Sequence, residues 1–303
     1  MDYIGIDIGS TASKVVVKGD HDIHFVLPTG WSSKETCQTI KDRLLEDSVD
    51  VLSDDSKVVA TGYGRVAVDF ADHVITEITC HARGGREMAG DECAIIDVGG
   101  QDTKIILVSG GMVQDFQMND KCSAGTGKFL EIMANRLGVT LQELFDMADK
   151  GTVLPISSLC TVFAESEVIN YIGEGQKRED IAAGVVDSVA NKVAQLAMKK
   201  NLPEKVILTG GLSSAGFSSV TAPILQRFSH RNLDRLYHLP NTEDMRVHLV
   251  PHSLQRKRKK DNKKITQNRI YDFRKSGSDF FCIHRLTYLF CLFIMNNGDG
   301  ICP

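Results

Sequence analysis

Several common signatures are missing from this 303-residue chain. It has no GxxxxGK[ST] phosphate loop and no GxGxxG motif that opens a helix, so two widespread nucleotide-binding folds find no support. No uncharged apolar run reaches the roughly 18 residues of a membrane helix. The nearest candidate, residues 280–295, contains His284 and Arg285, and the first residues lack the basic start of a secretory signal. We therefore expect a cytoplasmic protein without a membrane partner.

Cysteine is also sparse, with eight residues and no CxxC pair. Eight thiols in a chain of this length are too few for a disulfide scaffold, and the chain is long enough to form its core without one. The thiols are expected to be free, to bind metal or to act as nucleophiles.

There is no overall excess of positive charge, since the formal net charge is −4. The distribution is uneven, however: residues 252–303 hold eleven Lys/Arg against four Asp/Glu, and the change begins at the basic run 256–260. That run could bind nucleic acid or an acidic partner. A solvated tail is the preferred interpretation, because nothing in the rest of the chain supports nucleic acid as a partner.

The body of the chain contains an internal repeat. DIGSTASKVVV (7–17) recurs as DVGGQDTKIIL (97–107), each with an aspartate that ends an apolar strand, a polar glycine-containing turn and a lysine that opens the next strand. A period of about 90 residues indicates a duplicated domain rather than a solenoid. We expect domains at 1–90 and 91–216, followed by a divergent tail at 217–303.

Hydrophobic periodicity predicts alternating strands and helices, and hence an α/β fold. The predicted strands are 2–8, 14–18, 23–27, 57–61, 93–98, 104–108, 112–117 and 205–209, and the predicted helices are 33–45, 81–88, 123–137, 161–172 and 181–199.

The glycine-containing turns are suited to phosphate. Glycines between strands let backbone N–H groups converge on an anion, and two such hairpins, one in each repeat, can hold the phosphates of a nucleotide from opposite sides. Asp7 and Asp97 at the strand ends would suit a hydrated Mg²⁺. The candidate nucleotide-binding residues are Gly9, Ser10, Thr11, Lys14, Asp97, Gly99, Gly100, Gly210 and Gly211.

The order of these motifs resembles the acetate and sugar kinase, heat-shock chaperone and actin superfamily. This resemblance implies two duplicated ribonuclease-H-like (actin-like ATPase) domains with a nucleotide cleft between them. NDKCSAGTGKFLE (119–131) and SSLCTVFAESEVI (157–169), with DVGGQDTK (97–104) and LTGG (208–211), are similar to the ATPase activators (component A) of 2-hydroxyacyl-CoA dehydratases, the BadF/BadG/BcrA/BcrD-type family. The resemblance covers about residues 1–215.

Cys122 and Cys160 each precede a predicted helix, where exposed N–H groups stabilise thiolates. Two thiols cannot complete a four-thiolate site, although a symmetric dimer would supply four. Composition alone favours the interpretation of a lone cysteine as a small buried hydrophobe. The family resemblance implies that both ligate one [4Fe–4S] cluster bridging a homodimer. Cys37, Cys80 and Cys93 are interpreted as structural.

The family resemblance also implies the activity: ATP hydrolysis drives transfer of one low-potential electron, received from ferredoxin or flavodoxin, to a 2-hydroxyacyl-CoA dehydratase. Asp7 and Asp102 are candidate catalytic carboxylates. Gln101 is the candidate for orienting the attacking water, or alternatively a turn-stabilising amide. Glu165 is a candidate partner of the ribose.

Two other classes remain open at this point. A small-molecule kinase of the same fold would need a base aspartate and would have no use for Cys122 and Cys160. A filament-forming assembly protein would likewise leave them unexplained.

The C-terminal part departs from the family pattern. Residues 250–255 approach the expected Gly/Ala-rich ending, but the basic run follows instead. We interpret residues 217–303 as a frameshifted or otherwise altered end.

Overall fold

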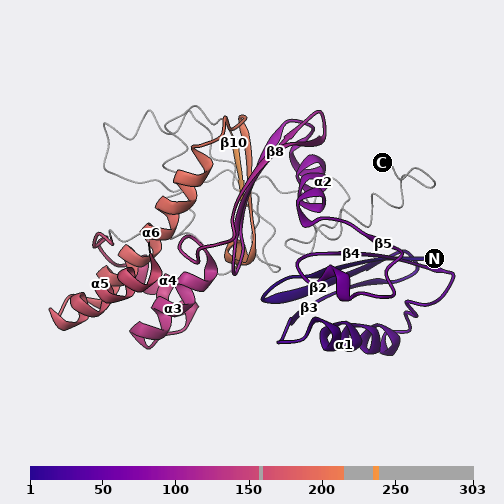
Figure 1. The fold of residues 1–303 in the computed structure, drawn as a ribbon, viewed down its shortest axis with the longest axis horizontal. Coiled ribbons are helices and arrows are strands. Elements are labelled where there is room, and N and C mark those ends of the chain that lie inside the picture. Colours follow the sequence, from indigo (N-terminus) through magenta and orange to yellow (C-terminus); the bar gives the residue numbers. More distant parts are fainter. Residues whose placement is uncertain (157–159, 215–234, 239–303) are drawn as a thin grey trace, which may run out of the picture. The chain divides into compact units, whose positions relative to one another are not determined.

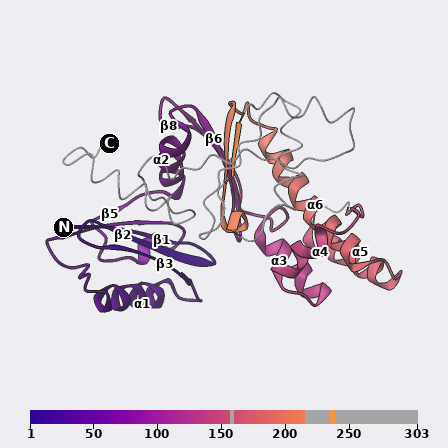
Figure 2. The same ribbon diagram turned by 180° about the vertical axis from the view of Figure 1, so that it is seen from behind.

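The computed structural model describes residues 1–156, 160–214 and 235–238. These residues form two compact units, one made of residues 1–91 with 108–114 and the other of residues 92–107 with those from 115 onward. There are two five-stranded sheets, one in the first unit and one that belongs mainly to the second (Figures 1 and 2). Most of the predicted divergent tail, 217–303, lies outside the described residues.

The sheet of the first unit has the strand order β3-β2-β1-β4-β5. The first three strands form an antiparallel meander, and the last two continue the sheet in parallel on the other side of β1. The central strand β1 is an almost continuous apolar run because it is buried by neighbours on both edges and both faces. The strands are β1 (Asp2–Ile8), β2 (Ala12–Lys18), β3 (Asp22–Pro28), β4 (Ser56–Thr61) and β5 (His73–Val74).

Two helices pack against this sheet from opposite faces. Helix α1 (Ser33–Glu46) begins after Ser32, an N-cap whose hydroxyl accepts from the Glu35 amide. It packs on the face that carries Val58 and Ala60, whereas Cys80 of α2 (Glu77–Ala89) contacts Val59 between them. Alternate residues of β4 therefore serve the two helices. A short 3₁₀ turn, η1 (Arg65–Ala67), follows β4.

The sheet of the second unit repeats this plan in the order β10-β9-β6-β7-β8. Its central strand β6 is flanked by the next strand of the chain and by the later parallel strand β9, as β1 is flanked by β2 and β4. The predicted duplication is thus confirmed. The strands are β6 (Cys93–Val98), β7 (Thr103–Ser109), β8 (Met112–Asn119), β9 (Lys205–Thr209) and β10 (Arg235–His238); the short turn η2 (Gly211–Ser214) follows β9.

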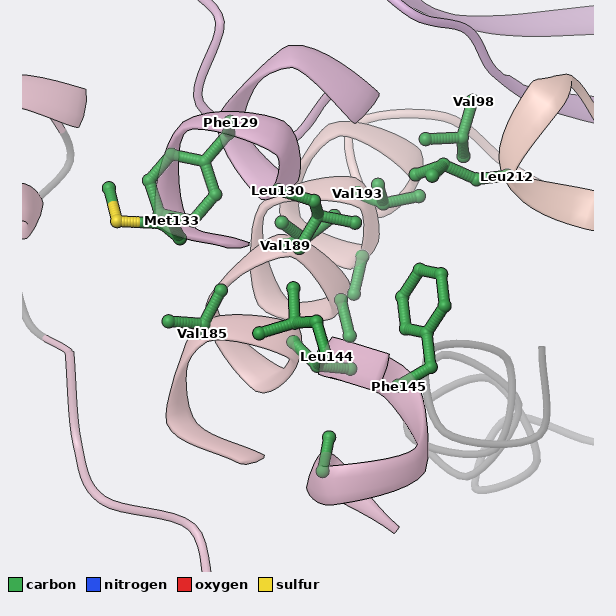
Figure 3. Close-up of a cluster of buried hydrophobic side chains, with 14 of the residues drawn as sticks. Val98, Phe129, Leu130, Met133, Leu144, Phe145, Val185, Val189, Val193 and Leu212 are labelled. Atoms are coloured by element: carbon green, nitrogen blue, oxygen red, sulfur yellow. The ribbon is translucent and has the colours of Figure 1, made fainter. Parts of the chain in front are cut away.

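Helices α3 (Gly127–Leu137), α4 (Leu141–Ala148), α5 (Thr161–Gly173) and α6 (Arg178–Ala197) belong to the second unit. Figure 3 shows their shared core, in which Leu130, Leu144 and Val189 meet from three different helices. Phe145 lies in the same cluster and is fully buried. Val98, the last residue of β6, and Leu212, which follows Gly211, belong to the same core.

Three details correct the sequence predictions. Helix α3 begins at Gly127 and not at 123, because residues 123–126 form a turn with Gly125 at a φ of +88°. Helix α4 was not predicted, although Thr140 and Glu143 form a capping box at its start. Strand β10, which pairs with β9, was not predicted either. Among the described residues, no helix is both long and apolar enough to cross a membrane.

We expect Phe145→Ala to lower the free energy of unfolding of the second unit by about 3–5 kcal/mol, because it removes a fully buried ring and leaves a cavity. Phe116→Ala is the matched control, since that ring on β8 is half exposed, and it should cost far less. Urea unfolding measures both. Equal losses would show that Phe145 does not belong to the core.

Candidate functional site

The first candidate turn, residues 9–11, connects β1 to β2 beside an ion pair. Lys14 Nζ lies 2.7 Å from Asp7 Oδ2, because the antiparallel register places these residues opposite each other. A Cβ on Gly9 would lie 2.6 Å from the Ala12 carbonyl oxygen, so the turn requires glycine there. Ser10 and Thr11 are exposed at the tip, where their hydroxyls are free to meet an anion from solvent.

Thr29, which follows β3, stabilises this turn through two hydrogen bonds. Its amide donates to the Thr11 carbonyl at 3.0 Å, and its hydroxyl donates to the Gly9 carbonyl at 2.7 Å. Ser13 Oγ lies 2.8 Å from Thr29 Oγ1 and is therefore the donor in that pair, since Thr29 has only one hydroxyl hydrogen. The Thr36 hydroxyl donates to the Thr29 carbonyl and connects α1 to the same network.

The second carboxylate oxygen of Asp7, Oδ1, is buried without a hydrogen bond in the part of the chain that the structure describes. Asp7 Oδ1 and Thr61 Oγ1 are buried and have no hydrogen-bond partner among the described residues. A Cβ on Gly62, whose φ is +89°, would lie 2.3 Å from Asp7 Oδ1. A buried anionic oxygen without a donor is the kind of group that a hydrated Mg²⁺ satisfies. The residues here fit the predicted metal ion.

The second candidate turn, residues 99–102, repeats the ion pair with one more carboxylate. Lys104 Nζ lies 3.4 Å from Asp97 Oδ2 and 2.7 Å from Asp102 Oδ1. The Gly99 amide donates to the Asp102 carbonyl at 2.9 Å, and a Cβ on Gly99 would lie 2.7 Å from Asp102 Oδ1. Gln101 is exposed at the tip, where it is accessible to a bound molecule and to water.

The glycine pair after β9 reaches the same end of the sheet. Parallel pairing places Thr209 beside Asp97, and its hydroxyl donates to Asp97 Oδ1 at 2.9 Å. The next residue, Gly210, has a φ of +100°, and a Cβ there would lie 2.2 Å from the Val98 carbonyl oxygen. The first unit has the same pattern in Thr61-Gly62 beside Asp7, but there the hydroxyl and the carboxylate are not paired.

The two candidate cluster ligands lie on neighbouring segments. Cys122 is half-buried and Cys160 is exposed, and neither is in a disulfide. Ser123 Oγ and Thr161 Oγ1, one residue further along each segment, are 2.8 Å apart. Cys160 is the N-cap of α5, as predicted. The prediction that Cys122 directly precedes a helix is wrong, since α3 begins five residues later.

Helix α5 exposes apolar side chains next to Cys160. Only Ala164 and Val168 of this helix are buried, whereas Val162 and Phe163 are each 65% exposed. Ile169 and Ile172 are also exposed. A patch of this kind on a helix is typical of a surface that another protein covers.

The structure thus brings the predicted residues into three groups: Asp7, Gly9, Ser10, Thr11 and Lys14; Asp97, Gly99, Gly100, Gln101, Asp102, Gly210 and Gly211; and Cys122 with Cys160. Glu165, the candidate ribose partner, pairs with Arg136. Four residues of these groups were not predicted as site residues: Thr29, Thr61, Lys104 and Thr209. The Thr-Gly pairs at 61–62 and 209–210 and the lysine repeated at 104 were the available signals, but Thr29 had none.

Two copies of one sheet, each with an aspartate–lysine pair and a glycine turn at the end of its central strand, define an ATPase of the actin-like class. A family model for the BadF/BadG/BcrA/BcrD ATPase family matches residues 4–222, and the chain belongs to that family.

Named relatives and solved structures support this assignment. The chain is 44% identical over 229 residues to the activator of lactoyl-CoA dehydratase from Anaerotignum propionicum, covering 74% of this chain and 88% of the relative. Component A of (R)-2-hydroxyglutaryl-CoA dehydratase from Acidaminococcus fermentans matches with a TM-score of 0.68 and 38% identity, covering 75% of this chain and 88% of that one. The activator of 2-hydroxyisocaproyl-CoA dehydratase from Clostridium difficile, solved with bound ADPNP, matches with a TM-score of 0.67 and 37% identity. The match covers 75% of this chain and 85% of that one. The predicted family and the fold of two duplicated ribonuclease-H-like domains are confirmed.

Thiol reactivity should separate the structural cysteines from the candidate ligands. Burial raises the pKa of Cys37 to about 11 and that of Cys80 to about 12, with a smaller rise from nearby carboxylates. At pH 8 their thiolate fractions are then no more than about 0.1%, so iodoacetamide should leave them unmodified in the folded, iron-free chain while it labels Cys122 and Cys160. Mass spectrometry identifies the modified sites, and a urea-denatured sample is the control. Rapid labelling of folded Cys80 would contradict this assignment.

Gly62→Ala tests whether the site needs the free space beside Asp7 Oδ1. The new methyl group would meet Asp7 Oδ1 and the Ile8 carbonyl oxygen at 2.3 and 2.5 Å, at a positive φ. We expect a loss of stability of about 2–5 kcal/mol, from strain plus overlap, together with weaker Mg²⁺-dependent ADPNP binding. Gly30→Ala is the matched control, because its φ is +59° and no atom lies within 4 Å of a Cβ there. If both variants lost the same stability, backbone strain alone would be responsible.

Proposed function

We propose that this chain is an ATP-dependent activator of a 2-hydroxyacyl-CoA dehydratase or a related CoA-substrate enzyme. In this proposal two copies share one [4Fe–4S] cluster, and ATP hydrolysis drives delivery of a single low-potential electron to the partner. Ferredoxin or flavodoxin supplies that electron. The observation that carries the proposal is that the turn at 99–102 is hydrogen-bonded directly to the start of α3, shortly after Cys122, through the Gly127 and Lys128 amides.

The nucleotide part of the proposal uses the two turns. Backbone amides of Gly9 and Gly100 bind phosphate oxygens, and Lys14 offsets the phosphate charge. Gly99 keeps the second turn tight, because its amide donates to the Asp102 carbonyl. Asp7 holds Mg²⁺ or its water through the unpaired Oδ1. Gln101, which is exposed, orients the attacking water, while Asp102 is fixed by Lys104 at 2.7 Å and serves the water shell. Gly210 and Gly211 leave room for the adenosine.

Asp7 and Asp97 differ in what they can do. Both oxygens of Asp97 are engaged, one by Thr209 and one by Lys104. Asp97 is therefore held in one orientation and is suited to accept a hydrogen bond from bound water, whereas Asp7 retains an oxygen for direct contact with a cation.

The cluster part of the proposal uses the two thiols. When bound, a [4Fe–4S] cluster supplies one-electron chemistry at low potential. Cys122 and Cys160 are accessible thiols on segments that the Ser123–Thr161 pair holds together, so one chain offers half of a four-thiolate site. A second copy related by a two-fold axis supplies the other half. The exposed apolar residues of α5, beginning at Val162 and Phe163, are suited to that contact.

Iron content tests this proposal. Protein purified without oxygen should contain about four iron and four sulfide per two chains, and Cys122→Ala should lose both while still binding ADPNP. Cys37→Ala is the matched control, because that buried cysteine lies in the core of the first unit and should leave iron unchanged.

Iron-free wild type that transfers phosphate to a sugar would favour a small-molecule kinase instead. Loss of both iron and ADPNP binding in Cys122→Ala would indicate a structural role for that thiol.

A further inference from the structure

The short segment 122–125, which contains Cys122, has all of its backbone carbonyls engaged. Asn119 Nδ2 donates to the carbonyls of Cys122 and Ala124 at 3.0 and 2.9 Å. The Thr126 hydroxyl donates to the Ser123 carbonyl at 2.7 Å. The Thr103 hydroxyl donates to the Gly125 carbonyl at 2.7 Å. Four consecutive peptide units are thereby fixed, although the segment is neither helix nor strand.

Two of these donors come from the sheet that carries the second turn. Thr103 is the first residue of β7, directly after Asp102, and is 1% exposed. Asn119 is the last residue of β8, so both of its amide hydrogens connect the end of that strand to the segment. The segment therefore accepts hydrogen bonds from side chains of both β7 and β8.

The turn itself is joined to the start of α3, two residues beyond the segment. The Gly127 amide donates to the Gly99 carbonyl at 2.9 Å, and the Lys128 amide donates to the Gly100 carbonyl at 2.7 Å. Gly127 packs so closely there that a Cβ would lie 3.2 Å from Gly100 Cα. The turn cannot move relative to the start of α3 without breaking one of these two hydrogen bonds.

We infer that Thr103 and Asn119 are positioning residues that couple the 99–102 turn to Cys122. They hold the cysteine segment rigid, so that a change in what the turn binds changes the environment of the Cys122 thiol. The Ser123–Thr161 hydroxyl pair extends the connection to Cys160. This inference rests on the proposed function in one respect, namely that the turn binds nucleotide phosphate.

Thr103→Val tests the coupling, because it keeps the shape of the side chain and removes the donor to Gly125. The probe is the alkylation rate of Cys122 in the full-length, iron-free chain, measured by mass spectrometry with and without ADPNP and Mg²⁺. In the wild type, ADPNP should change this rate. In Thr103→Val the ratio of the rates should shrink by about fivefold, the factor that corresponds to one neutral hydrogen bond of about 1 kcal/mol. Thr103→Ser retains the hydroxyl and should restore the wild-type ratio.

The ratio of rates separates coupling from a merely structural role, since general loosening would raise both rates together. Asn119→Asp, which replaces two donors with an acceptor, should also reduce the ratio. Ser188→Ala removes a hydroxyl that donates only to the Val185 carbonyl in α6, and it should leave the ratio unchanged.

An unchanged ratio in Thr103→Val, or a wild type that binds ADPNP without any change at Cys122, would overturn the inference. Failure to bind ADPNP would overturn it together with the nucleotide part of the proposed function. If wild type purified without oxygen contained no iron, and ADPNP still changed the alkylation rate of Cys122, the cluster would be refuted and the coupling supported.

Discussion

A carboxylate buried at the end of a central strand needs a cation beside it, and both halves of this molecule are arranged around that requirement. Removing one partner from a buried pair leaves an uncompensated charge, which costs about 3–5 kcal/mol. Lys14 meets the need of Asp7 and Lys104 that of Asp97, each lysine standing seven residues after its aspartate. That spacing allows only a tight turn between two adjacent strands. The glycines at 9 and 99 follow from it, because a side chain at either position would overlap the residue that closes the turn.

The two halves then diverge in how the turn is supported. In the first half, the Gly9 carbonyl accepts from the side chain of Thr29, the residue directly after β3. In the second half, the equivalent Gly99 carbonyl accepts from the backbone amide of Gly127, at the start of α3. The first turn is thus tied to the residue that follows β3, while the second is tied to the helix that follows the Cys122 segment. The same divergence appears at the aspartates, since Thr209 occupies an oxygen of Asp97 and Thr61 leaves the matching oxygen of Asp7 unpaired. The first half, with the unpaired oxygen of Asp7, is suited to hold a cation. The second half is suited to transmit a displacement of the 99–102 turn to α3.

The sequence repeat was sufficient to predict the central strands, the duplicated fold and the two turns, because the aspartate, the glycine and the lysine are all local to one hairpin. Support from distant residues could not be predicted in the same way. Thr29 lies about twenty residues from Gly9 in the chain, and its role depends on the β2–β3 register. The start of α3 was misplaced because Ser123 and Ala124 are compatible with a helix, and the turn there depends on donors from Asn119 and Thr103. Helix α4 is only eight residues long and was missed, although its capping box and the helical spacing of Leu144, Phe145 and Ala148 were visible in the sequence.

In the proposed dimer, the rigidity of each subunit limits how ATP could act on the cluster. The Ser123–Thr161 pair and the engaged carbonyls of 122–125 fix Cys122 relative to Cys160 within one chain. A nucleotide-dependent change that conserves these hydrogen bonds cannot separate the two thiols of one subunit. It has to change how the two subunits are arranged relative to each other, and each subunit then moves its two thiols together. The exposed side chains of α5, next to Cys160, are then the contacts that such a movement would rearrange. Packed interfaces favour discrete arrangements over continuous deformation, so the shared cluster would experience distinct environments in different nucleotide states.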